Sequence, residues 1–284
     1  MKNWTVSLVL LGLMSIGTAG AEGIKLDATT RAKCLKVLRD GLNSAEFWPS
    51  IHAAEALTLA GKGKEVRKFL EPKLKTETDD QKRCGLAREL SRAGDKARSQ
   101  VLLDILKKKD DHGHVHAAES LYKVGWTGDG KPIEAAFAQT SNVRLRLMAA
   151  AALGRNGNAE AMTYLRDRTR EEKDPTLYFI SAWVLGRIGD KSDIELIRKR
   201  IPDAPDAWTK AFLEHSLANL GDPEGRQALV RNLKSDDARI RIYAAVFAGE
   251  ARMVSTKAQL IKLLDDENLD ARIRAAQALL VLSR

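Results

Sequence analysis

The sequence has few cysteines and few aromatic residues, and each shortage excludes a class of protein. Two cysteines in 284 residues cannot build a disulfide-dense small domain or a zinc site of four cysteines within one chain. Only 14 aromatic residues follow residue 21, whereas alanine and leucine are abundant, and this balance favours helix over a β-sheet core. With 44% hydrophobic and 30% charged residues, the chain is typical of a globular protein rather than a disordered or polytopic one.

The sequence also lacks the common signatures of catalysis and nucleotide binding. It contains no nucleophile elbow, no phosphate-binding loop and no glycine fingerprint of a dinucleotide-binding fold. We therefore expect no cofactor.

The first 21 residues have the pattern of a secretory signal peptide. Lys2 precedes an apolar run over residues 6–16, and Ala19 and Ala21 form a small-x-small cleavage pattern before Glu22. The apolar run is about 11 residues, short of the roughly 20 that span a bilayer. We expect export to the periplasm or secretion, with no transmembrane segment after cleavage and one domain over residues 22–284. A retained N-terminal helix is the alternative.

The charge balance is basic. The whole chain carries +9, and removal of Lys2 with the signal peptide leaves 46 basic against 38 acidic residues, or +8. Basic charge often indicates nucleic acid, but export makes that partner unfavourable, and an anionic polysaccharide or another protein fits better. The excess lysine and arginine can also simply solvate outer helix faces. The two cysteines, Cys34 and Cys84, either form one disulfide or stay as buried thiols.

A repeat of about 32 residues organises the chain. Six glycines recur at intervals of 31 to 33 residues, each after an alanine-rich segment that ends Leu-x-x-x-Gly, and the series continues to Arg252 and Ser283. Glycine at this place supplies the left-handed conformation that ends a helix. The glycines are Gly61, Gly94, Gly125, Gly157, Gly189 and Gly221.

A second helical pattern lies between successive alanine-rich segments, for example over residues 64–74 and 158–170. The sequence therefore predicts an all-α fold, a right-handed α-solenoid (α-α superhelix) of about eight helix pairs. One pair cannot bury its apolar face alone, so neighbouring repeats must stack. The first repeat lacks a predecessor and the last lacks an obvious cap, so we expect unfolding to spread from both ends.

Several repeat segments resemble the short HEAT-like repeats of phycobilisome-lyase-type proteins. The resemblance covers residues 28–284 and is carried by residues 145–157, 242–249 and 273–280. It implies the fold but not one function, because such families include bilin lyases, scaffold and transport factors, DNA-repair glycosylases and a di-iron hydroxylase. The di-iron enzymes use His-Glu dipeptides, which this sequence lacks.

Candidate binding residues lie opposite the predicted core. We number positions from the leucine of Leu-x-x-x-Gly, and positions −9, −5, −2 and +2 share the far side of the same helix, the concave face of a HEAT-like solenoid. Large aromatic side chains on such a face indicate a binding site, although those at −5 can also be core residues. The predicted ligand-binding residues are Trp48, His52, Glu55, Arg88, His112, His116, Glu119, Trp183, Trp208, Phe212 and His215.

The +2 row carries a cation in four consecutive repeats, at Arg92, Lys123, Arg155 and Arg187. A ladder of this kind suits an extended anionic ligand, and a solvated face is the alternative.

One local cluster is suggestive of chemistry. His112 and His116 are spaced i, i+4 with Glu119 after them, a spacing that can hold a divalent metal on a helix. The acidic residues before His112 can instead cap the helix, and we assign no metal ligand. We therefore predict an exported binding or scaffold module that recognises a protein segment or anionic polymer on its concave face. The alternative is a lyase-like or metal-dependent enzyme that uses the histidines and glutamates of repeats 1–3.

Overall fold

The computed structural model describes residues 23–284, which form sixteen α-helices and no strand. The predicted signal peptide lies outside these described residues. Eight helices form an outer layer: α1 (Ala28–Leu42), α3 (Gly63–Thr76), α5 (Ser99–Leu106), α7 (Lys131–Ala138), α9 (Ala159–Glu171), α11 (Asp193–Arg198), α13 (Pro223–Asn232) and α15 (Lys257–Leu263). Eight form an inner layer: α2 (Phe47–Leu59), α4 (Asp80–Arg92), α6 (His114–Val124), α8 (Val143–Arg155), α10 (Pro175–Ile188), α12 (Ala207–Leu220), α14 (Ala238–Glu250) and α16 (Leu269–Leu282).

Each repeat is one outer and one inner helix, as the repeat pattern predicts. The inner helices are the alanine-rich segments, and their small side chains allow close packing against neighbouring helices. The apolar core lies between the two layers. The fold is therefore the predicted all-α solenoid of eight helix pairs.

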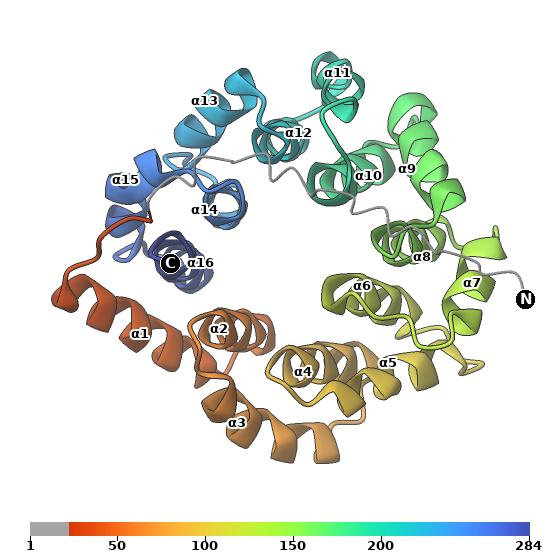
Figure 1. The fold of residues 1–284 in the computed structure, drawn as a ribbon, viewed down its shortest axis with the longest axis horizontal. Coiled ribbons are helices and arrows are strands. Elements are labelled where there is room, and N and C mark those ends of the chain that lie inside the picture. Colours follow the sequence, from red (N-terminus) through yellow and green to blue (C-terminus); the bar gives the residue numbers. More distant parts are fainter. Residues whose placement is uncertain (1–22) are drawn as a thin grey trace, which may run out of the picture.

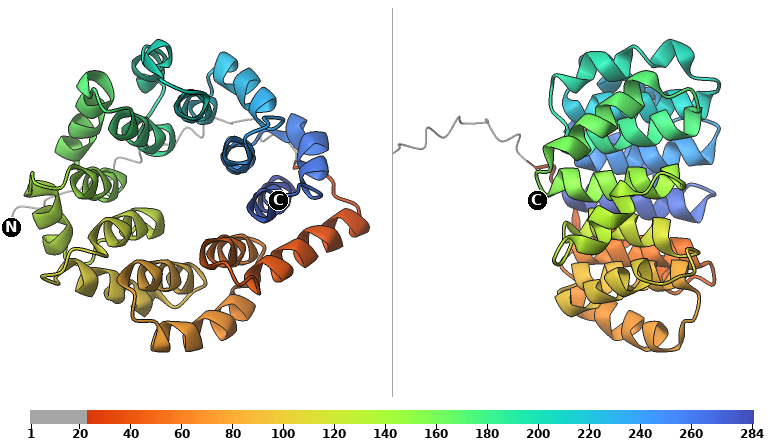
Figure 2. Two further views of the ribbon diagram at one scale, coloured as in Figure 1. Left: turned by 180° about the vertical axis from the view of Figure 1, so that it is seen from behind. Right: turned by 90° about the vertical axis from the view of Figure 1, so that its right-hand side faces the viewer.

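The solenoid closes on itself into a ring. Figures 1 and 2 show the eight inner helices around a common centre, with the last repeat beside the first. Helix α16 packs against both α1 and α2, so the first and last repeats share one hydrophobic core that includes Leu38, Ile51 and Leu279.

Polar contacts join the ends of the described chain as well. The backbone N–H of Ile24 donates to the carbonyl of Leu282 at 2.9 Å, and Lys33 Nζ lies 2.6 Å from Asp265 Oδ1. The first repeat thus has the last repeat as its neighbour. The expectation of two free ends from which unfolding spreads was wrong, because the ends bury each other.

Gly41 permits the close approach of α1 to α16. A Cβ atom at Gly41 would lie 2.6 Å from Cδ1 of Ile273, which is shorter than any ordinary carbon contact. The Ile273 side chain is fully buried in this space. Closure therefore depends on a residue without a side chain at this helix crossing.

The repeated glycines end the inner helices as predicted, with one exception. Five of the six have φ between +67° and +109°, and Arg252, which continues the series, has φ of +52°. Gly189 instead has φ of −81°.

Both cysteines are buried free thiols, so the disulfide alternative is wrong. Burial raises the pKa of Cys34 to about 11 and that of Cys84 to about 12. The thiols therefore act as small apolar core residues.

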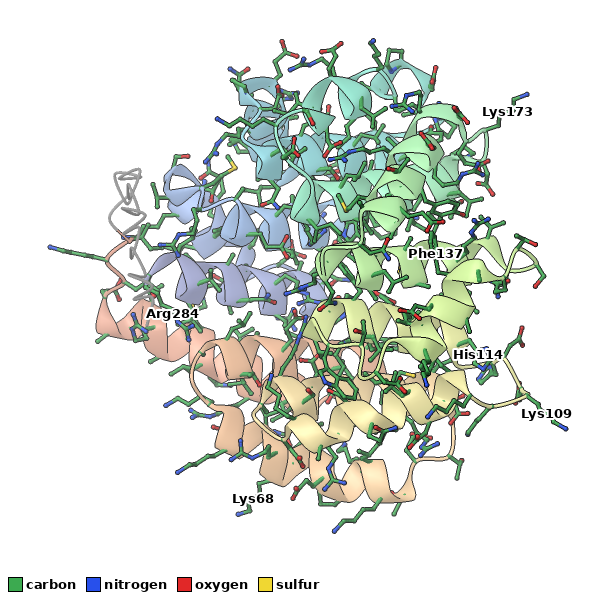
Figure 3. All side chains as sticks on the ribbon, turned by 45° about the vertical axis from the view of Figure 1, so that its right-hand side comes forward. Lys68, Lys109, His114, Phe137, Lys173 and Arg284 are labelled. Carbon is green, nitrogen blue, oxygen red and sulfur yellow. The ribbon has the colours of Figure 1, made fainter. Side chains whose placement is uncertain are left out.

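Within residues 23–284 no helix is long and apolar enough to cross a membrane. Many basic side chains extend into solvent from the outside of the ring, as Figure 3 shows for Lys68, Lys109 and Lys173. Part of the excess positive charge therefore lies on the solvated outer surface. This was one of the two alternatives that the sequence allowed.

Candidate functional site

The inner layer encloses a cavity of about 370 Å³ at the centre of the ring, which we call the central cavity. Every inner helix contributes at least one residue to its wall. The lining residues are His52, Glu55, Arg92, Glu119, Tyr122, Lys123, Arg155, Trp183, Arg187, Trp208, Arg239, Ile242, Tyr243, Val246, Glu250, Asp270 and Arg274. All but Tyr122 and Ile242 belong to the four rows that the repeat register defines.

The central cavity is narrow enough for side chains of non-neighbouring helices to meet. The rings of Tyr122 on α6 and Trp183 on α10 are 5.7 Å apart at an angle of 64°. Arg187 Nη2 on α10 lies 2.8 Å from Glu250 Oε2 on α14. The guanidinium of Arg187 also lies between the rings of Trp183 and Phe247, at 4.4 and 4.1 Å from their centroids. These contacts hold the cavity wall in one arrangement.

The wall carries more positive than negative charge. Six lining residues are lysine or arginine and four are carboxylates, which leaves an excess of two positive charges. The predicted cations Arg92, Lys123, Arg155 and Arg187 all line the cavity, so their row faces inward rather than forming a freely solvated ladder.

Glu55 is the electrostatic centre of the ring closure. Its carboxylate lies 2.8 Å from Arg92 Nη1 on α4 and 2.9 Å from Arg274 Nη1 on α16. Burial opposes the charge of Glu55, but Arg92 and Arg274 outweigh it and hold its pKa well below the usual range. The carboxylate is thus ionised between two guanidinium groups from opposite sides of the closure.

Glu119 forms a second internal pair. Its Oε1 lies 2.6 Å from Lys123 Nζ, one turn further along α6. Burial by itself favours a higher pKa for Glu119, but the charges of Lys123 and Arg88 outweigh burial and lower the pKa to about 2. Glu119 is therefore ionised at neutral pH and already partnered by Lys123.

Arg155 differs from the other cations of the central cavity. Among residues 23–284 it has no carboxylate within 4.0 Å, and its Nη1 donates only to the carbonyls of Tyr122 and Lys123, at 3.1 and 3.4 Å. Its remaining donors can therefore reach an anion in the cavity.

Three buried polar atoms of the cavity-lining residues have no hydrogen-bond partner within the described part of the chain. They are the hydroxyl of Tyr122, Nε1 of Trp183 and Nε of Arg274. Burial raises the pKa of Tyr122 to about 12, so its hydroxyl keeps its proton. All three groups can donate, and a buried donor without a partner costs about 1–3 kcal/mol. These three atoms have almost no accessible surface, so they lie behind the cavity wall rather than on it.

His52 and Asp270 form a pair across the ring closure. Nδ1 of His52 lies 2.8 Å from Oδ1 of Asp270, which leaves Nε2 of the imidazole outside this bond. Burial and the charge of Arg274 lower the pKa of His52 despite Asp270, so the imidazole is neutral at pH 7. A neutral histidine oriented by a carboxylate can accept a proton.

Six of the predicted site residues lie together. His52, Glu55, Glu119, Trp183 and Trp208 line the central cavity, and Phe212 lines a neighbouring cavity that also includes Glu119, Trp183 and Trp208. Trp183 packs against the core, and the ring of Trp208 lies 4.6 Å from that of the buried Phe212. Both tryptophans are thus part of the walls of the two cavities.

Two predicted site residues were placed wrongly on an open face. Arg88 is 5% exposed and pairs with Glu89 at 2.6 Å. His215 is fully buried, stacks on Phe247 with centroids 5.5 Å apart, and has Nε2 3.2 Å from Asn232 Nδ2. Both positions fall on the concave row, but Arg88 turns to Glu89 of its own helix and His215 turns to Asn232 of the outer helix α13 and to the core residue Phe247.

Trp48, His112 and His116 lie outside the central cavity. Trp48 is 38% exposed and stacks on His116 with centroids 5.6 Å apart. His112 precedes α6, which begins at His114, so His112 and His116 do not share a helical face. His112 instead lies 3.2 Å from Asp79. Among the described residues no three histidine, cysteine or acidic side chains are placed to hold a metal.

His215 makes stability depend on pH. Burial and the charge of Arg187 lower its pKa to about 3, so the folded protein does not take up the proton that the unfolded chain binds below about pH 6.5. Between pH 7 and pH 5 we expect this residue alone to lower the free energy of unfolding by about 2 kcal/mol. His215→Gln should reduce that pH dependence in urea unfolding. An unchanged slope in the His215 variant would contradict this assignment.

The sequence analysis missed the cavity residues of the last two repeats. Arg239, Tyr243, Asp270 and Arg274 occupy the same rows as the predicted residues, and the rows alone would have found them. Ring closure, which brings them beside His52 and Glu55, was the missing information. Tyr122 lies at +1, outside the rows, and no sequence signal marks it.

Comparisons with known proteins support the repeat assignment. Residues 131–218 match the family of HEAT repeats, so this part of the chain is similar to HEAT repeats. Two solved structures of engineered proteins are similar to it at 16% and 18% identity, each over 88% of this chain and over 96% and 82% of theirs, with TM-scores of 0.28 and 0.32. No curated protein matches the sequence.

Proposed function

We propose that this α-solenoid is an exported binding protein whose ligand is a small anion, or the charged end of an anionic chain, held in the central cavity. The observation that carries the proposal is Arg155, which has no carboxylate partner among the described residues and lies on a wall with an excess of two positive charges. Oxygen atoms of a carboxylate, sulfate or phosphate accept from such a guanidinium group.

A helical repeat scaffold also fits a protein-interaction module, but the size of the interior argues against a helical segment there. The central cavity has about 370 Å³, which is near the lower end of small-molecule sites. We therefore place any protein partner on the outside of the ring.

The test uses glucuronate, citrate and inorganic sulfate as probes, each at an ionic strength matched with sodium chloride. At least one should raise the melting temperature in a concentration-dependent way, because a ligand that binds only the folded state stabilises it. Arg239→Gln should weaken this binding about fivefold, because it removes one positive charge from the cavity wall, and should change the stability of the unliganded protein by less than about 1 kcal/mol, because the pair of Arg239 with Asp237 is exposed.

Arg155→Gln should also weaken binding, and Arg39→Gln on the outer layer serves as its matched control. Arg39 pairs with Glu65 away from the cavity, so its loss should leave affinity unchanged. Absence of binding by all three probes, or binding indifferent to both cavity variants, would refute the proposal.

The pair of His52 and Asp270 favours a second candidate, an enzyme in which His52 takes a proton from the bound ligand. Asp270 holds Nδ1, so Nε2 is the basic nitrogen. Glucuronate carries a hydrogen on the carbon beside its carboxylate, and exchange of that hydrogen in D₂O, followed by NMR, reports such a step. His52→Gln should abolish exchange and retain binding, whereas no exchange by the unmodified protein removes this candidate.

A further inference from the structure

A second cavity of about 290 Å³ adjoins the central cavity, and we call it the apolar cavity. The two share Glu119, Trp183, Trp208 and Tyr243 as a common wall. The other residues that line the apolar cavity are Val115, Arg144, Met148, Thr176, Phe179, Ile180 and Phe212.

Four aromatic rings form one side of the apolar cavity. Phe212 lies at the middle of the group, with its centroid 4.9 Å from Phe179, 4.6 Å from Trp208 and 4.6 Å from Tyr243. Trp208 and Tyr243 are 5.4 Å apart and nearly perpendicular. Rings in such edge contacts hold one another in place, so this side of the cavity is rigid.

The opposite side is aliphatic and adaptable. Val115, Met148 and Ile180 come from three successive inner helices, α6, α8 and α10. Methionine is flexible and polarizable and adjusts to irregular apolar groups. Phe179 and Ile180 stay half-buried although they are apolar, so part of their surface faces the cavity.

The two cavities differ in chemistry. The central cavity carries the excess cations, including Arg155 without a carboxylate partner among the described residues, whereas the apolar cavity has charged groups only at Glu119 and Arg144. Removing apolar ligand surface from water is favourable by about 25 cal/mol per Å². A purely polar anion would leave the apolar cavity without a matching group.

We propose that the ligand is amphipathic, with its anionic head in the central cavity and an aromatic or aliphatic body in the apolar cavity. This inference rests on the proposed function and names the class of its ligand. The head meets Arg155, and the body passes between Trp183 and Trp208 to lie against Phe212 and Ile180.

The test uses 8-anilinonaphthalene-1-sulfonate, an anionic head on a fused aromatic body that fluoresces in apolar surroundings. The folded, full-length protein should bind one equivalent, and glucuronate, citrate or sulfate should compete if it occupies the head position. Ile180→Gln should raise the dissociation constant about tenfold, because it places an amide against the apolar body. Val115→Thr, which keeps the side-chain shape, provides a milder second variant.

Leu59→Gln is the matched control, since Leu59 is 38% exposed and lies in neither cavity. Its affinity for the dye should equal that of the unmodified protein. Failure of the dye to bind, or binding indifferent to both Ile180→Gln and Val115→Thr, overturns the inference. If a small polar anion still binds in that case, the proposed function stands and only the amphipathic ligand is refuted, whereas loss of both refutes both.

Discussion

Glu55→Gln is expected to lower the free energy of unfolding by about 2–3 kcal/mol, less than the roughly 3–5 kcal/mol of a fully buried ion pair. The effect is smaller because Glu55 and Arg92 are about a fifth exposed and Arg92 keeps Glu89 as a partner. The substitution keeps the shape of the side chain but leaves Arg92 and Arg274 facing each other without the carboxylate between them. Arg274 is only 8% exposed, so water cannot replace the lost charge well. Urea unfolding followed by circular dichroism measures the change.

Glu65→Gln is the matched control for this variant. Glu65 pairs with Arg39 at 2.9 Å, but both side chains are more than a third exposed. Exposed pairs contribute about 0–1 kcal/mol, so the control should be nearly neutral. Equal effects in the two variants would mean that Glu55 is not held between buried cations.

The second large effect concerns the crossing of α1 and α16. Ile273→Ala should cost about 2–5 kcal/mol because the isoleucine is fully buried. Gly41→Ala should cost about 1–3 kcal/mol, because its new Cβ meets Ile273 at 2.6 Å. In the double variant the added methyl group occupies space that Ile273 has left, so we expect the two costs to be less than additive by at least about 1 kcal/mol.

The sign of the Gly41 effect separates a closed ring from an open solenoid. Without α16 beside it, alanine in place of a helical glycine stabilises by about 0.5–1 kcal/mol. A stabilising Gly41→Ala, with additive effects in the double variant, would therefore contradict contact between the first and last repeats.

The repeat, the helix pairs and the inward-facing rows were predictable because each is local. A leucine and a glycine fix the register of an inner helix, and the register then assigns His52, Trp183 and Arg187 to one face. The series of glycine positions that end the inner helices even predicts the place of Arg252, which takes the left-handed conformation without being glycine.

Ring closure was not predictable in the same way, because it depends on the sum of small rotations between eight repeats. No single residue determines the total rotation, although Gly41 and Ile273 make the close contact that results from it. The error on His215 has another origin, because the register gives its row but not the contacts that its side chain makes with Asn232 of the outer helix α13 and the core residue Phe247. The functional pairs of Glu55 with Arg274 and His52 with Asp270 exist only after closure.

The central claim is that the two ends of the repeat array join and thereby enclose the cavity. Carbodiimide, which links an amine to a carboxylate in direct contact, tests it at Lys33 and Asp265, an exposed pair 2.6 Å apart on opposite sides of the closure. Lys36 and Asp40, 2.6 Å apart within α1, provide the internal control. Mass spectrometry of the digested monomer should show the link between Lys33 and Asp265 as well as the control link. The control link alone, at a protein concentration where it forms fully, would contradict a closed ring.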